Sequence, residues 1–255
     1  MRAAVEVENL RKVFRVRERG PALSGAFRQL LAPKSREVVA VDQVSFGIAP
    51  GERVAFVGQN GAGKSTTIKM LAGVLHPDGG AARVAGCIPW RERQRLSYRI
   101  GTVFGQRTQL WYHLPVCDSF ALLRHVYDQS GEAYASRSRS LIEAFAIGPH
   151  LQKPVRQLSL GERMRCEIVA SLLHAPEVLF LDEPTIGLDV AAKATIREVI
   201  RDESVRGGRT LLLTSHDTAD MERVCEDPPM DEIVHAIYAR ADTDARSQRA
   251  LEAVS

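Results

Sequence analysis

The residues best suited to chemistry form the run Gly58-Gln59-Asn60-Gly61-Ala62-Gly63-Lys64-Ser65-Thr66. An apolar stretch at residues 53–57 precedes it, and a segment with helical spacing at residues 67–72 follows it. A G-x4-G-K-S run between a strand and a helix is typical of a phosphate-binding loop. Its glycines let backbone N–H groups turn inward, and the helix N-terminus attracts an anion. Lys64 can reach the outer phosphates and the Ser65 hydroxyl can ligate Mg²⁺, so the run predicts a nucleoside triphosphate site.

Two adjacent carboxylates, Asp182 and Glu183, follow the apolar run at residues 178–181. Neighbouring strand residues point to opposite faces, so one carboxylate can reach a metal while the other polarises water. An isolated Asp-Glu pair is usually only a solvated strand end. Its position between a buried strand and Pro184-Thr185 favours the catalytic interpretation.

A second helix N-terminus is indicated by Leu158-Ser159-Leu160-Gly161-Glu162. Ser159 with Glu162 three residues later is a capping box, which places Ser159 at the N-cap. Taken alone, this pattern indicates only a well-capped helix. The chain nevertheless has two helix ends suited to anions, and one ATP cannot use both from the same direction.

The remaining pattern predicts an α/β fold. Strands are expected at residues 4–10, 38–48, 53–57, 99–104, 178–181 and 210–214, and helices at 115–129, 132–145 and 190–205. Their alternation implies a parallel sheet with the helical middle as an inserted lobe. A basic segment from Arg11 to Arg36 is expected to contain a short amphipathic helix between Pro21 and Pro33. That helix fits a membrane surface or a permease contact, and a solvated basic loop is an equal alternative.

Composition narrows the class of protein. Charged residues make up 25% and hydrophobic residues 45% of 255 residues, which is ordinary for a globular protein. The net charge of +3 is too small to argue for a nucleic-acid partner. The four cysteines form no C-x-x-C pair, so we expect reduced thiols. No stretch reaches the roughly 18 apolar residues of a membrane span, so work at a membrane is expected to pass through another chain.

Taken in order along the chain, these motifs resemble the nucleotide-binding subunit of an ABC transporter. They are the phosphate loop, Leu158-Ser159-Leu160-Gly161-Glu162, Leu181-Asp182-Glu183-Pro184 and Ser215-His216-Asp217. The match extends from about Val5 to Cys225. The segments Val103-Phe104-Gly105-Gln106-Arg107-Thr108-Gln109-Leu110-Trp111 and Glu183-Pro184-Thr185-Ile186-Gly187-Leu188-Asp189 most resemble ABC-2 type exporters, in particular the viologen-exporter group.

The resemblance implies a P-loop NTPase core with a parallel sheet, an N-terminal antiparallel β subdomain and a helical lobe at about residues 107–165. It implies ATP and Mg²⁺ as ligands, with Glu183 as general base and His216 as the switch histidine that contacts the γ-phosphate. It places Ser65, Gln106 and Asp182 at the metal. Phe14 is the candidate for an aromatic that stacks on adenine, with core packing as the alternative.

In this family two ATPase domains pair head-to-tail, which implies that Ser159 and Gly161 contact the γ-phosphate held by the partner and that Asp189 links the two sites. The implied partners are a second ATPase subunit, with a homodimer expected, and an integral membrane permease, at the cytoplasmic face of the cell membrane as a peripheral subunit. The family's second glycine is Leu160 here and its glutamine is Glu162, which we expect to point toward its own backbone. Alternatives are a relative that binds ATP but hydrolyses it poorly, and a soluble ABC ATPase outside transport.

The C-terminal part departs from the family's pattern. After Val224-Cys225-Glu226-Asp227-Pro228-Pro229 the expected further strands are missing, and residues 230–238 have helical spacing. We therefore expect an ATPase domain at residues 1–225 and a remnant helix and tail at 226–255. Loss of those strands would uncover a sheet edge, so a protein less stable than its full-length relatives is expected.

Overall fold

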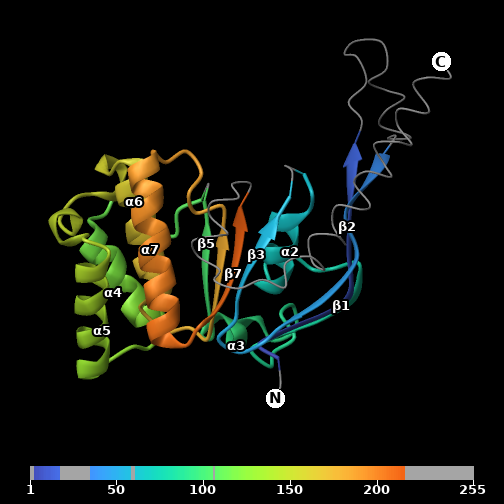
Figure 1. Cartoon of the computed structure of the whole chain (residues 1–255), viewed down its shortest axis with the longest axis horizontal. Coiled ribbons are helices and arrows are strands. Elements are labelled where there is room, and N and C mark those ends of the chain that lie inside the picture. Colours follow the sequence, from blue (N-terminus) through green and yellow to red (C-terminus); the bar gives the residue numbers. More distant parts are fainter. Residues whose placement is uncertain (1–2, 18–34, 59–60, 106, 216–255) are drawn as a thin grey trace, which may run out of the picture.

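The computed structural model describes residues 3–17, 35–58, 61–105 and 107–215. Within them lie two β-sheets, with helices packed on both sides of the second sheet (Figure 1). The strands are β1 (Val5–Arg17), β2 (Ser35–Ile48), β3 (Arg53–Val57), β4 (Gly79–Val84), β5 (Ile100–Phe104), β6 (Val178–Asp182) and β7 (Thr210–Ser215). The helices are α2 (Lys64–Leu71), α3 (Arg93–Ser97), α4 (Val116–Val126), α5 (Gly131–Ala144), α6 (Leu160–Leu172) and α7 (Val190–Gly207).

The parallel sheet has the strand order β3-β7-β6-β5. Its central strand β6 is buried at every position, as expected for a short apolar run covered on both faces. Because parallel strands point the same way, the ends of β3, β5, β6 and β7 meet at one edge of the sheet. This is the edge at which open α/β sheets bind ligands. The α/β prediction is confirmed.

The first sheet is antiparallel and has the order β2-β1-β4. Val5 pairs with Ile48 on one side and with Val84 on the other. This sheet packs through Leu10 and Val41 into a core that it shares with α2 and with one face of the parallel sheet. The predicted N-terminal antiparallel sheet is therefore present. Strand β4 and helix α3 were not predicted, because Gly79-Gly80-Ala81-Ala82 has weak β-propensity and α3 has only 5 residues.

Strand β1 continues to Arg17, beyond the predicted end at Leu10. The basic residues at its far end therefore lie on a strand, where Lys12 pairs with Asp78 at 3.2 Å and Arg15 with Glu37 at 3.1 Å. Arg17 and Ser35 face each other across β1 and β2. The predicted amphipathic helix between Pro21 and Pro33 lies outside the described residues. So do Cys225 and the predicted C-terminal helix and tail at 226–255.

The helical lobe consists of α4 and α5, with α6 joining it to the sheet (Figure 1). Its core contains Phe120, Leu141 and Phe145, which are at most 5% exposed and are continuous with buried residues of α6. Two short 3₁₀ turns, Gly148–His150 and Val155–Gln157, lead the chain back to α6. The lobe lies within the predicted range of about 107–165, while the predicted domain bounds themselves stay a prediction. In the described part of the chain, Cys87, Cys117 and Cys166 are free thiols. None of the helices described combines the length and the apolar character that crossing a membrane requires.

Candidate functional site

The phosphate loop leaves β3 and enters α2 through residues in the left-handed backbone region. Gly61 has φ +88° and Gly63 has φ +86°, values that side chains rarely permit. At Gly63 a Cβ would also clash with the carbonyl oxygen of Ala40 on β2. Gly63 is the N-cap of α2 and brings no side-chain cap, so the first-turn N–H groups of this helix are open to an anion.

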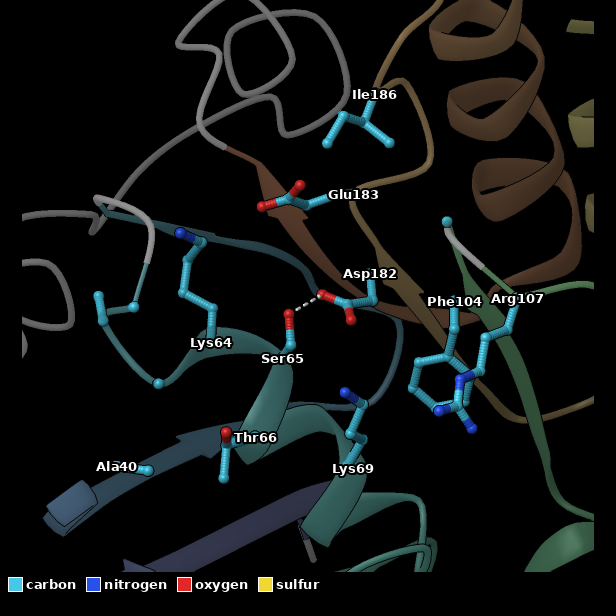
Figure 2. Close-up of a pocket in the computed structure, with 14 residues that line it drawn as sticks. Ala40, Lys64, Ser65, Thr66, Lys69, Phe104, Arg107, Asp182, Glu183 and Ile186 are labelled. Carbon is cyan, nitrogen blue, oxygen red and sulfur yellow. Dashed lines mark hydrogen bonds between the residues drawn. The ribbon is translucent and has the colours of Figure 1, made fainter. Parts of the chain in front are cut away.

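The two residues after Gly63 carry the polar atoms of the loop. Lys64 is only 5% exposed, and its Nζ donates a hydrogen bond of 2.5 Å to the carbonyl oxygen of Gly58. Ser65 Oγ donates a 2.8 Å hydrogen bond to Oδ1 of Asp182 at the end of β6 (Figure 2). The structure thereby joins the phosphate loop to the carboxylate pair, 117 positions apart in sequence.

The end of β6 is held by its neighbouring strands. Thr214 Oγ1 on β7 donates to the same Asp182 oxygen at 2.7 Å, and its backbone oxygen accepts from Glu183 N at 3.1 Å. Glu183 has φ +52°, so the chain turns sharply after Asp182 and the two carboxylates separate, Asp182 toward Ser65 and Glu183 away from it (Figure 2). On the other side Gly105 lets β5 come close, because a Cβ there would lie 2.6 Å from Glu183 O.

These groups surround a cavity of about 460 Å³. It contains three basic side chains, Lys64, Lys69 and Arg107, and two acidic ones, Asp182 and Glu183 (Figure 2). The volume of this cavity, its basic side chains and the N-terminus of α2 at its wall suit the phosphates of a nucleotide. The other lining residues are Ala40, Gly61, Ala62, Gly63, Ser65, Thr66, Phe104, Gly105 and Ile186.

Several of these lining residues were missed by the sequence analysis. Lys69 lies four positions after Ser65 on α2, and helical periodicity could have placed it on the same face. Arg107 and Ile186 belong to segments quoted for the resemblance, but nothing in their residue types indicated a cavity. Ala40 comes from another sheet and had no signal in the sequence.

The oxygen atoms of Ser65 and Asp182 suit a magnesium ion. Mg²⁺ prefers oxygen ligands and usually keeps several waters beside one or two protein groups and the substrate's phosphates. Within the described ranges no cluster of three His, Cys, Asp or Glu side chains could hold a metal by itself. The donor set therefore fits a metal that is shared with a phosphate ligand.

The predicted second helix end forms as expected. Ser159 is the N-cap of α6, its Oγ accepts from Glu162 N at 3.3 Å, and its own N–H donates to Glu162 Oε2 at 2.7 Å. This capping box is confirmed, and Glu162 does turn back to the backbone. The Ser159 N–H lowers the pKa of Glu162, which is also 3.5 Å from His150 Nδ1.

Ser159 and Gly161 line a separate cavity of about 480 Å³, together with Asp189 before α7. Asp189 Oδ1 accepts from the backbone N–H of Ala192 at 2.9 Å. These predicted residues thus come together, but in a different cavity from Lys64 and Glu183.

Six further residues were predicted at the site: Phe14, Gly58, Gln59, Asn60, Gln106 and His216. Phe14 lies on β1, is 37% exposed and has Lys12 Nζ 5.6 Å from its ring centre; it does not line the phosphate cavity. Gly58 is buried at the start of the loop. Gln59, Asn60, Gln106 and His216 lie outside the described residues.

Comparisons with known proteins agree with this geometry. The family model described as "ABC transporter" matches residues 41–186, and a model described as "AAA domain, putative AbiEii toxin, Type IV TA system" matches residues 153–220. The chain is 30% identical over 208 residues to the ABC transporter ATP-binding protein NatA of Bacillus subtilis (strain 168), covering 82% of this chain and 84% of that protein. It is 37% identical over 183 residues to the daunorubicin/doxorubicin resistance ATP-binding protein DrrA of Streptomyces peucetius, covering 71% of this chain.

It is 34% identical over 191 residues to the Nod factor export ATP-binding protein I of Ralstonia nicotianae (strain ATCC BAA-1114 / GMI1000), covering 75% of this chain. The chain spans 55% of the length of DrrA and 59% of that Nod factor export protein.

Solved structures give the same fold. A dimeric ATP-binding cassette in a post-hydrolysis state, bound to ADP and Pi, superposes with a TM-score of 0.69 at 21% identity, covering 85% of this chain and 89% of the other. The cbiO1 protein of Clostridium perfringens, part of the ABC transporter complex cbiONQ, gives a TM-score of 0.67 at 25% identity, covering 88% and 82%. With a family model across more than half its length and a 30% identical relative over most of both chains, this chain belongs to the ATP-binding proteins of the ABC transporter family, which are ATPases.

Proposed function

We propose that this ATPase energises an ABC-2 type membrane exporter through ATP-driven closure of a dimer. The observation that carries the proposal is the hydrogen bond between Ser65 and Asp182, because it assembles the phosphate loop and the carboxylate pair around one cavity. The names of two relatives support the direction of transport, since one is a Nod factor export protein and the other a daunorubicin/doxorubicin resistance protein.

In the proposed reaction Lys64 leaves the Gly58 carbonyl and donates to the outer phosphates of ATP, while the open N–H groups of α2 hold the inner ones. Ser65, Asp182 and, from the resemblance, Gln106 are the residues that would hold Mg²⁺. When bound, the ion would neutralise phosphate charge. Thr214 keeps the Asp182 carboxylate turned toward Ser65.

Hydrolysis is assigned to Glu183. Its carboxylate faces the cavity and accepts a proton from the attacking water as the water oxygen bonds to the γ-phosphorus (Figure 2). The bond from that phosphorus to the β–γ bridging oxygen breaks, and its electron pair stays on ADP. His216 is proposed to orient the water, as the resemblance implies.

The second cavity is proposed to act on the partner's nucleotide. Ser159 and Gly161 stand at the N-terminus of α6, which offers N–H donors and a partial positive charge. Asp189 lies in the same cavity and would link the two active sites. The dimeric arrangement of the solved ATP-binding cassette supports this pairing.

The proposed partners are a second copy of the chain and an integral membrane permease, with the ATPase peripheral at the cytoplasmic face. The helical lobe would transmit closure to the permease. Substrate identity would then lie with the permease, so no cargo is assigned.

The test is the ATPase activity of the purified chain and its variants. Glu183→Gln and Lys64→Ala should lose at least about 100-fold in kcat/KM, whereas Glu198→Gln, an exposed change on α7, should match the wild type. Activity near wild type in either site variant would refute the assignment. Co-expression with membrane proteins encoded beside the gene should yield a complex whose ATPase responds to reconstitution in vesicles. A chain that never associates with them would refute the transport role.

A further inference from the structure

A buried carboxylate outside both cavities joins α6 to the wall of the phosphate cavity. Glu167 lies on α6 and is 3% exposed. One of its carboxylate oxygens accepts from Thr108 Oγ1, and the other accepts from the backbone N–H of Gln109 at 3.1 Å. The side chain of Gln109 returns a hydrogen bond from Nε2 to the backbone oxygen of Glu167 at 2.9 Å. Three hydrogen bonds thus fasten two consecutive residues of one segment to one residue of the helix.

The fastened segment begins at the cavity. Arg107 lines the phosphate cavity three residues after the end of β5, and its N–H donates to Phe104 O at 2.8 Å. Leu110, three residues later, is 3% exposed in the core of the lobe. Between these two anchors, Thr108 and Gln109 are the residues that Glu167 holds.

The other end of the helix carries the second anion site. Ser159 at the N-cap of α6 is eight residues before Glu167, about 12 Å along a helix. A displacement of the segment after β5 must therefore move α6 with it, because hydrogen bonds on a buried carboxylate leave it little freedom to re-pair.

We propose that Glu167 is a positioning residue of the ATPase reaction, which holds Arg107 and the cavity wall in register with the N-terminus of α6. This inference deepens the proposed function and rests on it. Glu167 lines neither cavity. It acts by coupling the position of the segment after β5 to the position of the α6 N-terminus.

The electrostatics of the site agree with this role. Burial raises the pKa of Glu167, while the hydrogen bonds from Thr108, Gln109 and the N–H of Leu110 and the charge of Arg163 act in the opposite direction. A carboxylate in such surroundings depends on its donors. Loss of one donor is therefore expected to loosen the segment at Thr108 and Gln109, because water cannot easily reach the buried carboxylate and replace the lost hydrogen bond.

The experiment compares Glu167→Gln, Thr108→Val and Thr108→Ser in the full chain. Glu167→Gln places an amide N–H₂ against a donor, and Thr108→Val removes the hydroxyl while keeping the side-chain shape. Both should lower kcat about tenfold, as expected for a displaced wall, with the KM for ATP and the Kd for a fluorescent ADP analogue unchanged within about twofold. Thr108→Ser keeps the hydroxyl and should retain wild-type kcat. The double variant Glu167→Gln/Thr108→Val should lose no more than the worse single variant, because both break the same bond.

Ser171→Ala is the matched control. Ser171 is a buried polar residue of the same helix, but its hydroxyl donates to Ile168 O inside α6 and not to the segment. It should keep its kcat. Unchanged kcat per folded molecule in Thr108→Val and Glu167→Gln would overturn the inference, and so would a joint fall of kcat, ADP affinity and Tm, which is the signature of a merely structural residue. If Glu167→Gln fails to fold, the kcat of Thr108→Val still tests the inference. If Lys64→Ala and Glu183→Gln abolish activity while these variants do not, only this inference fails.

Discussion

The hydroxyl of Ser65 donates to the carboxylate of Asp182 at 2.8 Å, and Thr214 donates to the same oxygen at 2.7 Å. Two hydroxyls from two elements thus hold one carboxylate oxygen of Asp182, which lines the phosphate cavity. The geometry ties the start of α2 to the ends of β6 and β7, which are adjacent in the sheet.

Asp182→Asn should separate folding from catalysis. The amide oxygen can still accept from both hydroxyls, so the free energy of unfolding should change by only about 1 kcal/mol. Loss of the negative charge should weaken magnesium binding, and ATPase activity should fall about 100-fold. A magnesium titration of ATPase activity, beside a urea melt, checks both parts. Near wild-type activity at low magnesium would contradict the assignment.

Gly63→Ala and Gly61→Ala form a matched pair. The φ angles of Gly61 and Gly63 are +88° and +86°, but a Cβ at Gly63 would clash with Ala40 O, whereas no atom of the described residues lies within 4 Å of a Cβ at Gly61. Gly61→Ala should therefore lower the free energy of unfolding by only about 1 kcal/mol, the cost of a non-glycine residue at positive φ. Its nucleotide binding should be kept. Gly63→Ala should lose binding of a fluorescent ATP analogue. Equal binding by the two variants would show that the contact with β2 does not shape the loop.

Glu162→Gln tests the capping box through pH. Hydrogen bonding to the Ser159 N–H holds the pKa of Glu162 below its ordinary value of 4.5, so its charged form adds stability above that value. This contribution is lost as pH falls through the folded-state pKa. The melting temperatures of wild type and Glu162→Gln should therefore converge in acid and differ at pH 7. A difference that does not depend on pH would contradict the charged cap, and Glu162→Ala should lose about 1 kcal/mol at pH 7.

His174 should make stability fall in mild acid. It is 7% exposed, stacks on Tyr127 with ring centres 4.0 Å apart, and its Nε2–H donates to Ile100 O at 2.9 Å. Burial, helped by the charges of Arg137 and Arg209, lowers its pKa from 6.5 to about 4. The unfolded chain therefore binds a proton more readily, and stability should decline as pH drops from 6.5 toward 4. Urea melts of His174→Gln should show a shallower decline, and an equal slope would assign the effect to other groups.

Much of the site could be predicted because its signals are local. The phosphate loop, the buried strand before Asp182 and the Ser159–Glu162 capping box each depend on residues within a few positions. The cross-strand parts could not be predicted. Thr214 and Ala40 reach the site only through strand pairing and loop packing, and Glu167 contacts a segment 58 positions away.

The fold shows the same division. Strand β6 is recognisable from its apolar run, whereas β4 exists because Val5 and Val7 on β1 pair with Val84 and Ala82. Its glycines and alanines carry little preference of their own. The end of β1 was predicted too early, because charged residues such as Lys12 and Arg15 are typical of a loop. Their partners Asp78 and Glu37 are distant in the sequence, so the sequence alone did not indicate that the strand continues.

The backbone at Glu183 sets a limit on the stability of this protein. A non-glycine residue in the left-handed region lowers the free energy of unfolding by on the order of 1 kcal/mol. Glycine or asparagine would adopt the backbone conformation of Glu183 at a lower cost. Stability alone would favour another residue there, whereas the general-base role proposed for Glu183 requires a carboxylate. Under that proposal the protein gives up some stability for ATP hydrolysis, and variants designed for higher stability should keep Glu183.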